Sequence, residues 1–150
     1  MYWRTDTHWN QKGAFLAYSG LAKALALPIA SVTFKQGGAY SGDLVTISRL
    51  KNFPLHADDN WQAVWTMPPS AVVDFPSPNT VENVSPLSPL VVWVVGDSFS
   101  ESVLPYLNAT FKEIHYLGHL DSRFKTLAAD LAKAEKKPDL ILIVKVERSF

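Results

Sequence analysis

A serine in a tight turn and a histidine close to an aspartate are the residues of this chain best suited to chemistry. Ser98 belongs to the segment GDSFS, and His8 belongs to TDTHWN near the start of the chain. A serine hydroxyl becomes a nucleophile when a general base, usually histidine, takes its proton and a carboxylate orients that base. Asp6 precedes His8 by two residues, so in an extended segment both side chains face the same side, about 6.6 Å apart. These residues predict a Ser98–His8–Asp6 site for acyl transfer.

The turn around Ser98 follows a short, unbroken apolar run, LVVWVV, and precedes a predicted helix. Such a run is typical of a strand buried on both faces of a parallel sheet, and ligands of open α/β sheets bind at the carboxyl ends of the strands. Gly96 permits a tight turn, and unpaired amides at the helix start can stabilise an oxyanion. The alternative interpretation is that Ser98 or Ser100 only caps the helix.

The chain holds three other histidines that are candidates for the general base. His115 lies within the predicted strand EIHYL, which favours a place in the core or on a sheet face, and His56 lies in LHADDN, where Asp58 and Asp59 favour a turn. His119 follows the same strand as His115, so it is the second candidate for a base at that sheet edge.

The pair of Asp6 and His8 has two other interpretations. It can be a surface pair beside a Trp9 that packs into the core, and spacing alone does not decide between this and a catalytic pair. An Asp-x-His sequence can also chelate a metal together with Asp58 or Asp59, but no His-x-x-x-His pattern supplies a further ligand. We therefore expect no metal and no cofactor.

Composition excludes several classes of protein. The 150 residues are 47% hydrophobic and 19% charged, which is typical of a globular domain. Lys plus Arg and Asp plus Glu each number 14, so no basic excess supports binding to nucleic acid. Cysteine is absent, which removes disulfides, thiolate nucleophiles and Cys-based zinc sites. The apolar runs are too short for a membrane span, and no signal-peptide pattern opens the chain.

Helical spacing and breakers predict the elements of the first half. Asn10 is a good N-cap for a helix from about Gln11 to Ala26, which Pro28 ends. A β-like segment, SVTFK, precedes the turn GGAYSGD and a short helix near Leu44 to Leu50.

Residues 54–90 differ in composition from the rest of the chain. Six prolines fall between residues 68 and 89, which argues against a continuous helix or a central strand there. The segment WQAVWTM alternates enough to form an edge strand. We expect the remainder to be an irregular excursion within a single domain that spans residues 1–150.

After this excursion, predicted strands and helices alternate regularly along the chain. The apolar strand before Ser98 is followed by a helix from about Glu101 to Phe111 that bends or restarts near Pro105. The strand EIHYL, a helix capped by Asp121 or Ser122, and the strand LILIVKV complete the chain. This strand–helix alternation predicts an α/β fold with an open, mainly parallel sheet.

Taken together, TDTHWN and GDSFS resemble the SGNH-hydrolase-like domain of alginate O-acetyltransferases of the AlgX/AlgJ type and of the related DHHW proteins. The segments GAFLAYSGLAKAL and DLILIVKVERSF resemble further parts of that domain. The resemblance touches most of the chain except about residues 54–89. It implies a three-layer, flavodoxin-like sheet with a permuted order, in which the Asp and His precede the serine.

The resemblance also implies an activity. Ser98, His8 and Asp6 would form the catalytic triad of an exported or periplasmic enzyme that moves acetyl groups onto sugar hydroxyls, together with a membrane-bound acyltransferase. Family members carry further sheet strands before the histidine motif, and such a stretch is absent here. We therefore expect this chain to be a fragment truncated at its N-terminus, with an upstream stretch that includes an export signal.

Substrate contacts are predicted less directly. Trp9, Asp97 and Arg148 are candidates for contact with substrate, and Trp9, Trp61 and Trp65 offer flat faces to a sugar ring, although packing explains the tryptophans as well. A Glu147–Arg148 ion pair equally explains the arginine. Two other functions remain open, a carbohydrate esterase or deacetylase that uses water as acceptor, and a non-catalytic carbohydrate-binding or assembly domain.

Overall fold

A five-stranded sheet organises the second half of the chain in the computed structural model, which describes residues 1–49, 54–55, 59–65, 71–72, 80–118 and 120–146. Its strand order is β3-β4-β6-β5-β7. The strands are β3 (Ala71–Val72), β4 (Thr80–Asn83), β5 (Ser88–Gly96), β6 (Phe111–Tyr116) and β7 (Leu140–Val144). Strand β5 pairs in parallel with β6 and β7, and β4 pairs antiparallel with β6. The open, mainly parallel α/β sheet expected from the sequence is confirmed.

Strand β5 lies inside the sheet and is buried on both faces. Val92 and Val94 are fully buried within the main hydrophobic cluster, and the alternating residues Val91, Trp93 and Val95 are at most 6% exposed. A run without polar residues suits such a position because neither face of the strand meets water. The strand that ends at the Ser98 turn is therefore held by packing on both of its faces.

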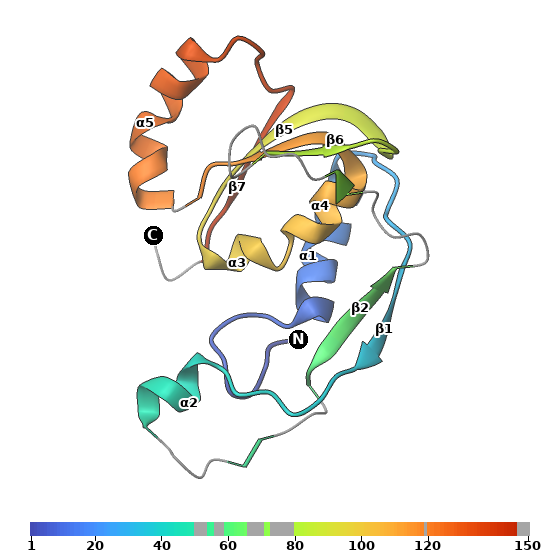
Figure 1. The fold of residues 1–150 in the computed structure, drawn as a ribbon, viewed down its shortest axis with the longest axis vertical. Helices are drawn as coiled ribbons and strands as arrows, with labels where there is room; N and C mark the ends of the chain where they lie inside the picture. The colour runs from blue at the N-terminus through green and yellow to red at the C-terminus, as the bar shows by residue number, and fades with distance from the viewer. Residues whose placement is uncertain (50–53, 56–58, 66–70, 73–79, 119, 147–150) are drawn as a thin grey trace.

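Helices cover the two faces of this sheet. The helices are α3 (Ser98–Glu101), α4 (Leu104–Thr110) and α5 (Leu120–Lys133). Helix α4 packs against β6 and β4, whereas α5 contacts β5. Figure 1 shows α1 (Gln11–Ala24) and α4 on one side of the sheet and α5 on the other, which gives the three layers expected from the resemblance. Pro105 falls in the first turn of α4, where a missing amide costs nothing, so the predicted restart is confirmed.

Helix α1 (Gln11–Ala24) anchors the N-terminal loop to this core. The Asn10 side chain accepts a hydrogen bond from the Gly13 amide, as the predicted N-cap should. The Tyr18 hydroxyl lies 2.7 Å from Thr110 Oγ1 and accepts a hydrogen bond from the Ala30 amide. Because Tyr18 is 1% exposed, these contacts join α1, α4 and the segment after α1 in the buried interior.

A second, two-stranded sheet lies beside α1. Strand β1 (Val32–Gln36) pairs antiparallel with β2 (Trp61–Trp65), and α2 (Asp43–Ser48) lies between them in the chain. The predicted strands in SVTFK and WQAVWTM are thus confirmed over Val32–Gln36 and Trp61–Trp65. Trp65 packs against Tyr106 with ring centroids 5.4 Å apart and is partly buried against the core, which favours packing over contact with a sugar.

The structure differs from the sequence prediction at several places in the second half of the chain. The segment 54–90 is less irregular than expected, because β2, β3, β4 and the start of β5 lie within it. Strand β4 extends the main sheet in the proline-free interval from Asn79 to Ser85, with Thr80 opposite His115. Helix α5 begins at Leu120, so Asp121 and Ser122 fall inside its first turn and are not its cap.

A helix that crosses a bilayer needs about 20 predominantly apolar residues. None of the helices in the described ranges is both long and apolar enough to span a membrane.

Candidate active site

The N-terminal loop meets the start of α3, and three side chains form a chain of hydrogen bonds there. His8 Nδ1 lies 2.6 Å from Asp6 Oδ1, and His8 Nε2 lies 2.7 Å from Ser98 Oγ. An ionised carboxylate can only accept, so Nδ1 carries the proton towards Asp6 and the neutral ring leaves Nε2 to accept from the Ser98 hydroxyl. The residues that the sequence singled out are thus within hydrogen-bond reach, in the order that a serine nucleophile requires.

The side chains of Asp6, His8 and Ser98 differ in their exposure to solvent. Asp6 is 8% exposed, the His8 side chain is 26% exposed, and Ser98 is exposed at the surface. The ring of His8 rests on Phe99 with centroids 4.8 Å apart. The carboxylate is therefore shielded from water, whereas the hydroxyl can meet a substrate that arrives from solution.

The turn that presents Ser98 is held by Asp97. One Asp97 oxygen accepts from the Phe99 amide at 2.9 Å, and the other accepts from the Val146 amide, just beyond β7, at 2.8 Å. A Cβ on Gly96 would come within 2.6 Å of Ser100 Oγ, so only glycine permits this close packing. Both Asp97 oxygens thus hold the turn, which favours a structural role over the contact with substrate that we predicted.

The amides of this turn bear on oxyanion binding. The Phe99 amide donates to the Asp97 side chain, and the Ser100 amide donates to the Asp97 carbonyl oxygen. Among the described residues, the Ser98 amide has no hydrogen-bond acceptor. This amide is thus available to a developing oxyanion next to the nucleophile, as in other serine sites that use a backbone N–H.

Asp6 is surrounded by donors from a second loop. Its Oδ1 accepts from the His8 amide at 2.9 Å as well as from the ring, and its Oδ2 accepts from the Tyr40 hydroxyl at 2.9 Å and the Asp43 amide at 3.3 Å. Burial alone would raise the pKa of Asp6, but these hydrogen bonds together hold the pKa below its ordinary value. Asp6 is therefore kept ionised and oriented.

The same contacts act on Tyr40 in the opposite sense. Burial first, and then the hydrogen bond to Asp6 and the negative charges of Asp6 and Asp43, raise the pKa of Tyr40 to about 12. Tyr40 thus remains a hydrogen-bond donor to Asp6 at neutral pH. Its ring also stacks on Trp3 with centroids 4.6 Å apart, which fixes its direction.

The loop before α2 packs tightly against the N-terminal loop that carries His8, here called the histidine loop. The Gly42 amide donates to Thr5 Oγ1 at 3.1 Å, and the Leu44 amide donates to the Thr5 carbonyl oxygen at 3.0 Å. A Cβ on Gly42 would collide with Asp6 Cβ and the Thr5 carbonyl oxygen. The sequence of GGAYSGD predicts only a turn. The structure shows that this segment also donates hydrogen bonds to Asp6, from the Tyr40 hydroxyl and the Asp43 amide. Nothing in its spacing marked these residues as neighbours of Asp6.

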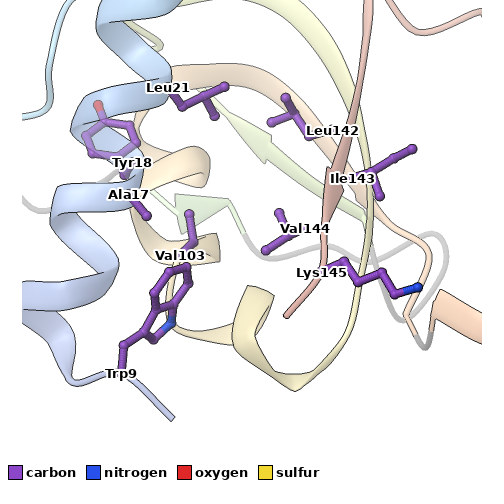
Figure 2. Close-up of a pocket in the computed structure, with 9 residues that line it drawn as sticks. All are labelled: Trp9, Ala17, Tyr18, Leu21, Val103, Leu142, Ile143, Val144 and Lys145. Carbon is purple, nitrogen blue, oxygen red and sulfur yellow. The ribbon is translucent and has the colours of Figure 1, made fainter. Parts of the chain in front are cut away.

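Trp9 packs beside this site. Its Nε1 donates to the Phe99 carbonyl oxygen at 3.0 Å, and its ring meets Phe99 edge-on at 5.6 Å. Figure 2 shows Trp9 at one end of a pocket of about 260 Å³ between α1 and β7, lined mainly by apolar side chains with Lys145 at its edge. This placement favours an anchoring role for Trp9 in holding α3 against the histidine loop.

The other predicted residues divide into two groups. Arg148, Glu147, His56, Asp58 and His119 lie outside the described residues. His115 lies on β6, where Nε2 is 2.5 Å from Glu113 Oε1 and Nδ1 is 3.2 Å from Thr80 Oγ1, in agreement with a place on a sheet face. The amino group of Lys12 lies 3.1 Å from the Trp61 ring centroid, so one face of that ring is covered.

Three ligand-type atoms also gather at this site. Asp6, His8 and Asp43 each offer one within 4.8 Å of the others. However, His8 Nδ1 bonds to Asp6 at 2.6 Å, and both Asp43 oxygens accept from Thr7, at 2.8 Å from its amide and 2.5 Å from its hydroxyl. The oxygens of Asp6 and Asp43 thus already accept hydrogen bonds from neighbouring groups. This arrangement is more typical of carboxylates that orient an imidazole than of carboxylates that bind a cation.

The fold is similar to three solved structures that were found by comparison. A DHHW family protein from Eubacterium siraeum matches with a TM-score of 0.60 and 15% identity, over 96% of this chain and 58% of that chain. PatB1 of Bacillus cereus matches with a TM-score of 0.60 and 16% identity, over 99% and 63%. The O-acetyltransferase domain of Pseudomonas putida AlgJ matches with a TM-score of 0.50 and 18% identity, over 98% and 56%.

These likenesses confirm the fold that the two motifs implied. This chain spans about three fifths of the length of the solved structures that it matches. No protein-family model and no curated protein sequence matches the chain.

Proposed function

We propose that this chain is the acyl-transfer domain of an O-acetyltransferase, which carries an acetyl group on Ser98 and passes it to a polysaccharide hydroxyl. The observation that carries the proposal is the hydrogen-bonded series from buried Asp6 through His8 to exposed Ser98. The similarity in fold to the AlgJ O-acetyltransferase domain supports transfer of acetyl. The two motifs that resemble the AlgX/AlgJ and DHHW types support a polysaccharide acceptor.

The first half of the reaction forms an acetyl-serine. His8 Nε2 takes the hydroxyl proton as Ser98 Oγ attacks the acetyl carbonyl carbon, and the carbonyl oxygen becomes an oxyanion. The Ser98 amide donates to that oxyanion, a type of contact worth about 3–4 kcal/mol per donor. The C–O bond to the donor then breaks, and the imidazolium returns its proton to the leaving oxygen. Asp6 stabilises the imidazolium throughout.

The second half repeats these steps with a new acceptor. A sugar hydroxyl gives its proton to His8 Nε2 while its oxygen attacks the acetyl carbon, and the bond to Ser98 Oγ breaks as that oxygen is protonated again. Water in place of the sugar gives hydrolysis with the same residues, so the esterase or deacetylase remains the second candidate. Ser98 is exposed, which permits either acceptor to approach.

The proposal places the reaction outside the cytoplasm, because the resemblance is to exported enzymes. The acetyl donor would then come through a partner such as a membrane-bound acyltransferase, as the resemblance implies. Arg148 remains a candidate to contact the substrate.

A transfer assay tests the proposed function. The chain is incubated with a chromogenic acetyl ester, with and without a mixture of defined oligosaccharides, and the products are weighed by mass spectrometry. An oligosaccharide heavier by one acetyl group, absent with Ser98→Ala, supports a transferase. Release of acetate alone supports the esterase, and no turnover of the ester by a folded sample favours the non-catalytic binding domain.

A further inference from the structure

A second carboxylate lies beside the histidine, on an element that the proposed mechanism does not use. Asp43, the first residue of α2, places its Oδ2 3.8 Å from His8 Nδ1. Asp6 lies closer to the same nitrogen, at 2.6 Å. The protonated side of the imidazole therefore faces two carboxylates from different segments.

Asp43 cannot leave this position without losing contacts. Its Oδ1 accepts from the Thr7 amide at 2.8 Å, and its Oδ2 accepts from the Thr7 hydroxyl at 2.5 Å. The Asp43 amide donates to Asp6 Oδ2 at 3.3 Å. Thr7 stands between Asp6 and His8 in the chain, so Asp43 holds the catalytic loop at its middle residue.

Asp6 and Asp43 act on His8 in different ways. Asp6 has donors on both oxygens, and one of these donors is the His8 ring, so it sets the tautomer and the direction of the imidazole. Asp43 makes no hydrogen bond to the ring at 3.8 Å, but its negative charge at this distance attracts a protonated ring. Its effect on His8 is therefore electrostatic.

We propose that Asp43 is a positioning residue for the acyl transfer, which holds the loop through Thr7 and stabilises the His8 imidazolium with its charge. This inference rests on the proposed function, because the imidazolium matters when His8 takes a proton from Ser98. Four groups face His8 in the described part of the chain: Asp6 from its own loop, Asp43 from α2, Tyr40 through Asp6, and Ser98 from α3.

Asp43→Asn separates charge from geometry. The asparagine oxygen can still accept from the Thr7 amide, and its NH2 group can donate to the Thr7 hydroxyl, which is able to accept as well as donate. The loop contacts are thus retained while one negative charge is removed. Asp43→Ala removes both, and Glu135→Gln removes one charge from an exposed residue after α5 as the matched control.

Two pH titrations test the inference. The first follows the His8 ring by NMR, assigned with His8→Gln, and needs no activity. The second follows the rate at which a fluorophosphonate labels Ser98 across pH. With Asp43→Asn, the imidazolium loses an anion 3.8 Å from Nδ1, so both midpoints move to lower pH. Glu135→Gln leaves both midpoints at the wild-type pH.

The outcomes distinguish this inference from the proposed function. Equal midpoints for wild type and Asp43→Asn in the NMR titration would overturn the role of Asp43, whatever the labelling shows. A shifted NMR midpoint without any labelling of wild type would keep the electrostatic role of Asp43 and reject the acyl-transfer function. Loss of activity in Asp43→Ala with unshifted midpoints in Asp43→Asn would reduce Asp43 to a loop contact.

Discussion

At the scale of single residues, the surroundings of Asp6 explain how a short N-terminal loop can hold a working base. A buried carboxylate is costly unless donors reach it, and Asp6 receives them from the His8 amide and ring, the Tyr40 hydroxyl and the Asp43 amide. These donors keep Asp6 charged, and the charge keeps the Nδ1 proton of His8 in place. The Nε2 lone pair then points at Ser98.

The lowered pKa of Asp6 predicts how stability depends on pH. A carboxyl group whose pKa is lower in the folded state contributes stability above its unfolded pKa, and this contribution is lost as pH falls through the folded pKa. Wild type should therefore exceed Asp6→Asn in stability at pH 7, and the difference should shrink as pH falls below about 3.8, the ordinary value for the group. Urea midpoints of both proteins at several pH values measure this, and a difference that does not vary with pH would refute it.

Residue types and order predicted part of this site. Ser98, His8 and Asp6, the proposed nucleophile, base and orienting carboxylate, each follow from a local pattern: a serine after a buried strand, and an Asp-x-His before a capped helix. Tyr40 and Asp43 did not follow, because 34 and 37 residues separate them from Asp6 and no local pattern marks a contact between two loops. Their chemistry became visible only when α2 was placed against the N-terminal loop.

At the scale of elements, the close approach of the loop before α2 predicts a strict need for glycine at position 42. In Gly42→Ala the new methyl group would overlap Asp6 and the Thr5 backbone, so α2 must shift and Asp6 must lose donors. We expect a loss of about 1–3 kcal/mol in unfolding free energy and slower Ser98 labelling.

Gly20→Ala is the matched control for this change. Gly20 is exposed in α1 and a Cβ there meets nothing within 4 Å, so alanine should stabilise the helix by about 0.5–1 kcal/mol. Thermal unfolding of both variants checks the pair. Equal effects at the two glycines would mean that the loop is not packed as described.

The junction of α1 with α4 depends on one buried hydroxyl. Thr110 Oγ1 donates to the Tyr106 carbonyl oxygen, so Tyr18 donates to Thr110 and accepts from the Ala30 amide. Tyr18→Phe leaves that amide unpaired, and we expect unfolding to become easier by about 1–3 kcal/mol. Denaturant unfolding checks this, with Tyr2→Phe as a control because Tyr2 is 56% exposed. No change in Tyr18→Phe would argue against this buried junction.

Helices and strands were predicted correctly where a single sequence pattern covers the whole segment. The apolar run of β5 and the capped α1 needed no knowledge of distant residues. Strand β4 was missed because the prolines on either side of it obscured a short interval, residues 79–85, in which the strand forms by pairing with β6 and β3. Pairing partners far apart in the chain are not visible in local composition.

At the scale of the whole molecule, one edge strand of the five-stranded sheet, β7, is apolar and partly exposed. Strand β7 carries the apolar sequence LILIV, yet no strand among the described residues pairs with its outer edge, and Ile143 is 53% exposed. A flat apolar edge favours pairing between copies. We expect this chain to self-associate as its concentration rises and Ile143→Lys to shift it towards the monomer. Analytical ultracentrifugation measures both, and a monomer at all concentrations in wild type would refute this prediction.

The architecture also explains why the base and nucleophile can lie so far apart in the chain. Helix α1 packs against α4, and Trp9 reaches the Phe99 carbonyl oxygen, so the histidine loop is carried to the carboxyl end of β5. The motifs alone suggested that two remote segments meet, and the contact across 90 residues comes from the packing of α1.

The account stands on a Ser98 hydroxyl that His8 and Asp6 make reactive, and labelling with a fluorophosphonate tests that claim most directly. The probe is added to wild type, Ser98→Ala, His8→Gln and Asp6→Asn, and the modified peptide is identified by mass spectrometry. We expect label on Ser98 in wild type, none in Ser98→Ala, and rates lowered on the order of 10⁴-fold in Asp6→Asn. Labelling of folded wild type at another residue, or labelling of Ser98 at an undiminished rate in His8→Gln, would contradict the account.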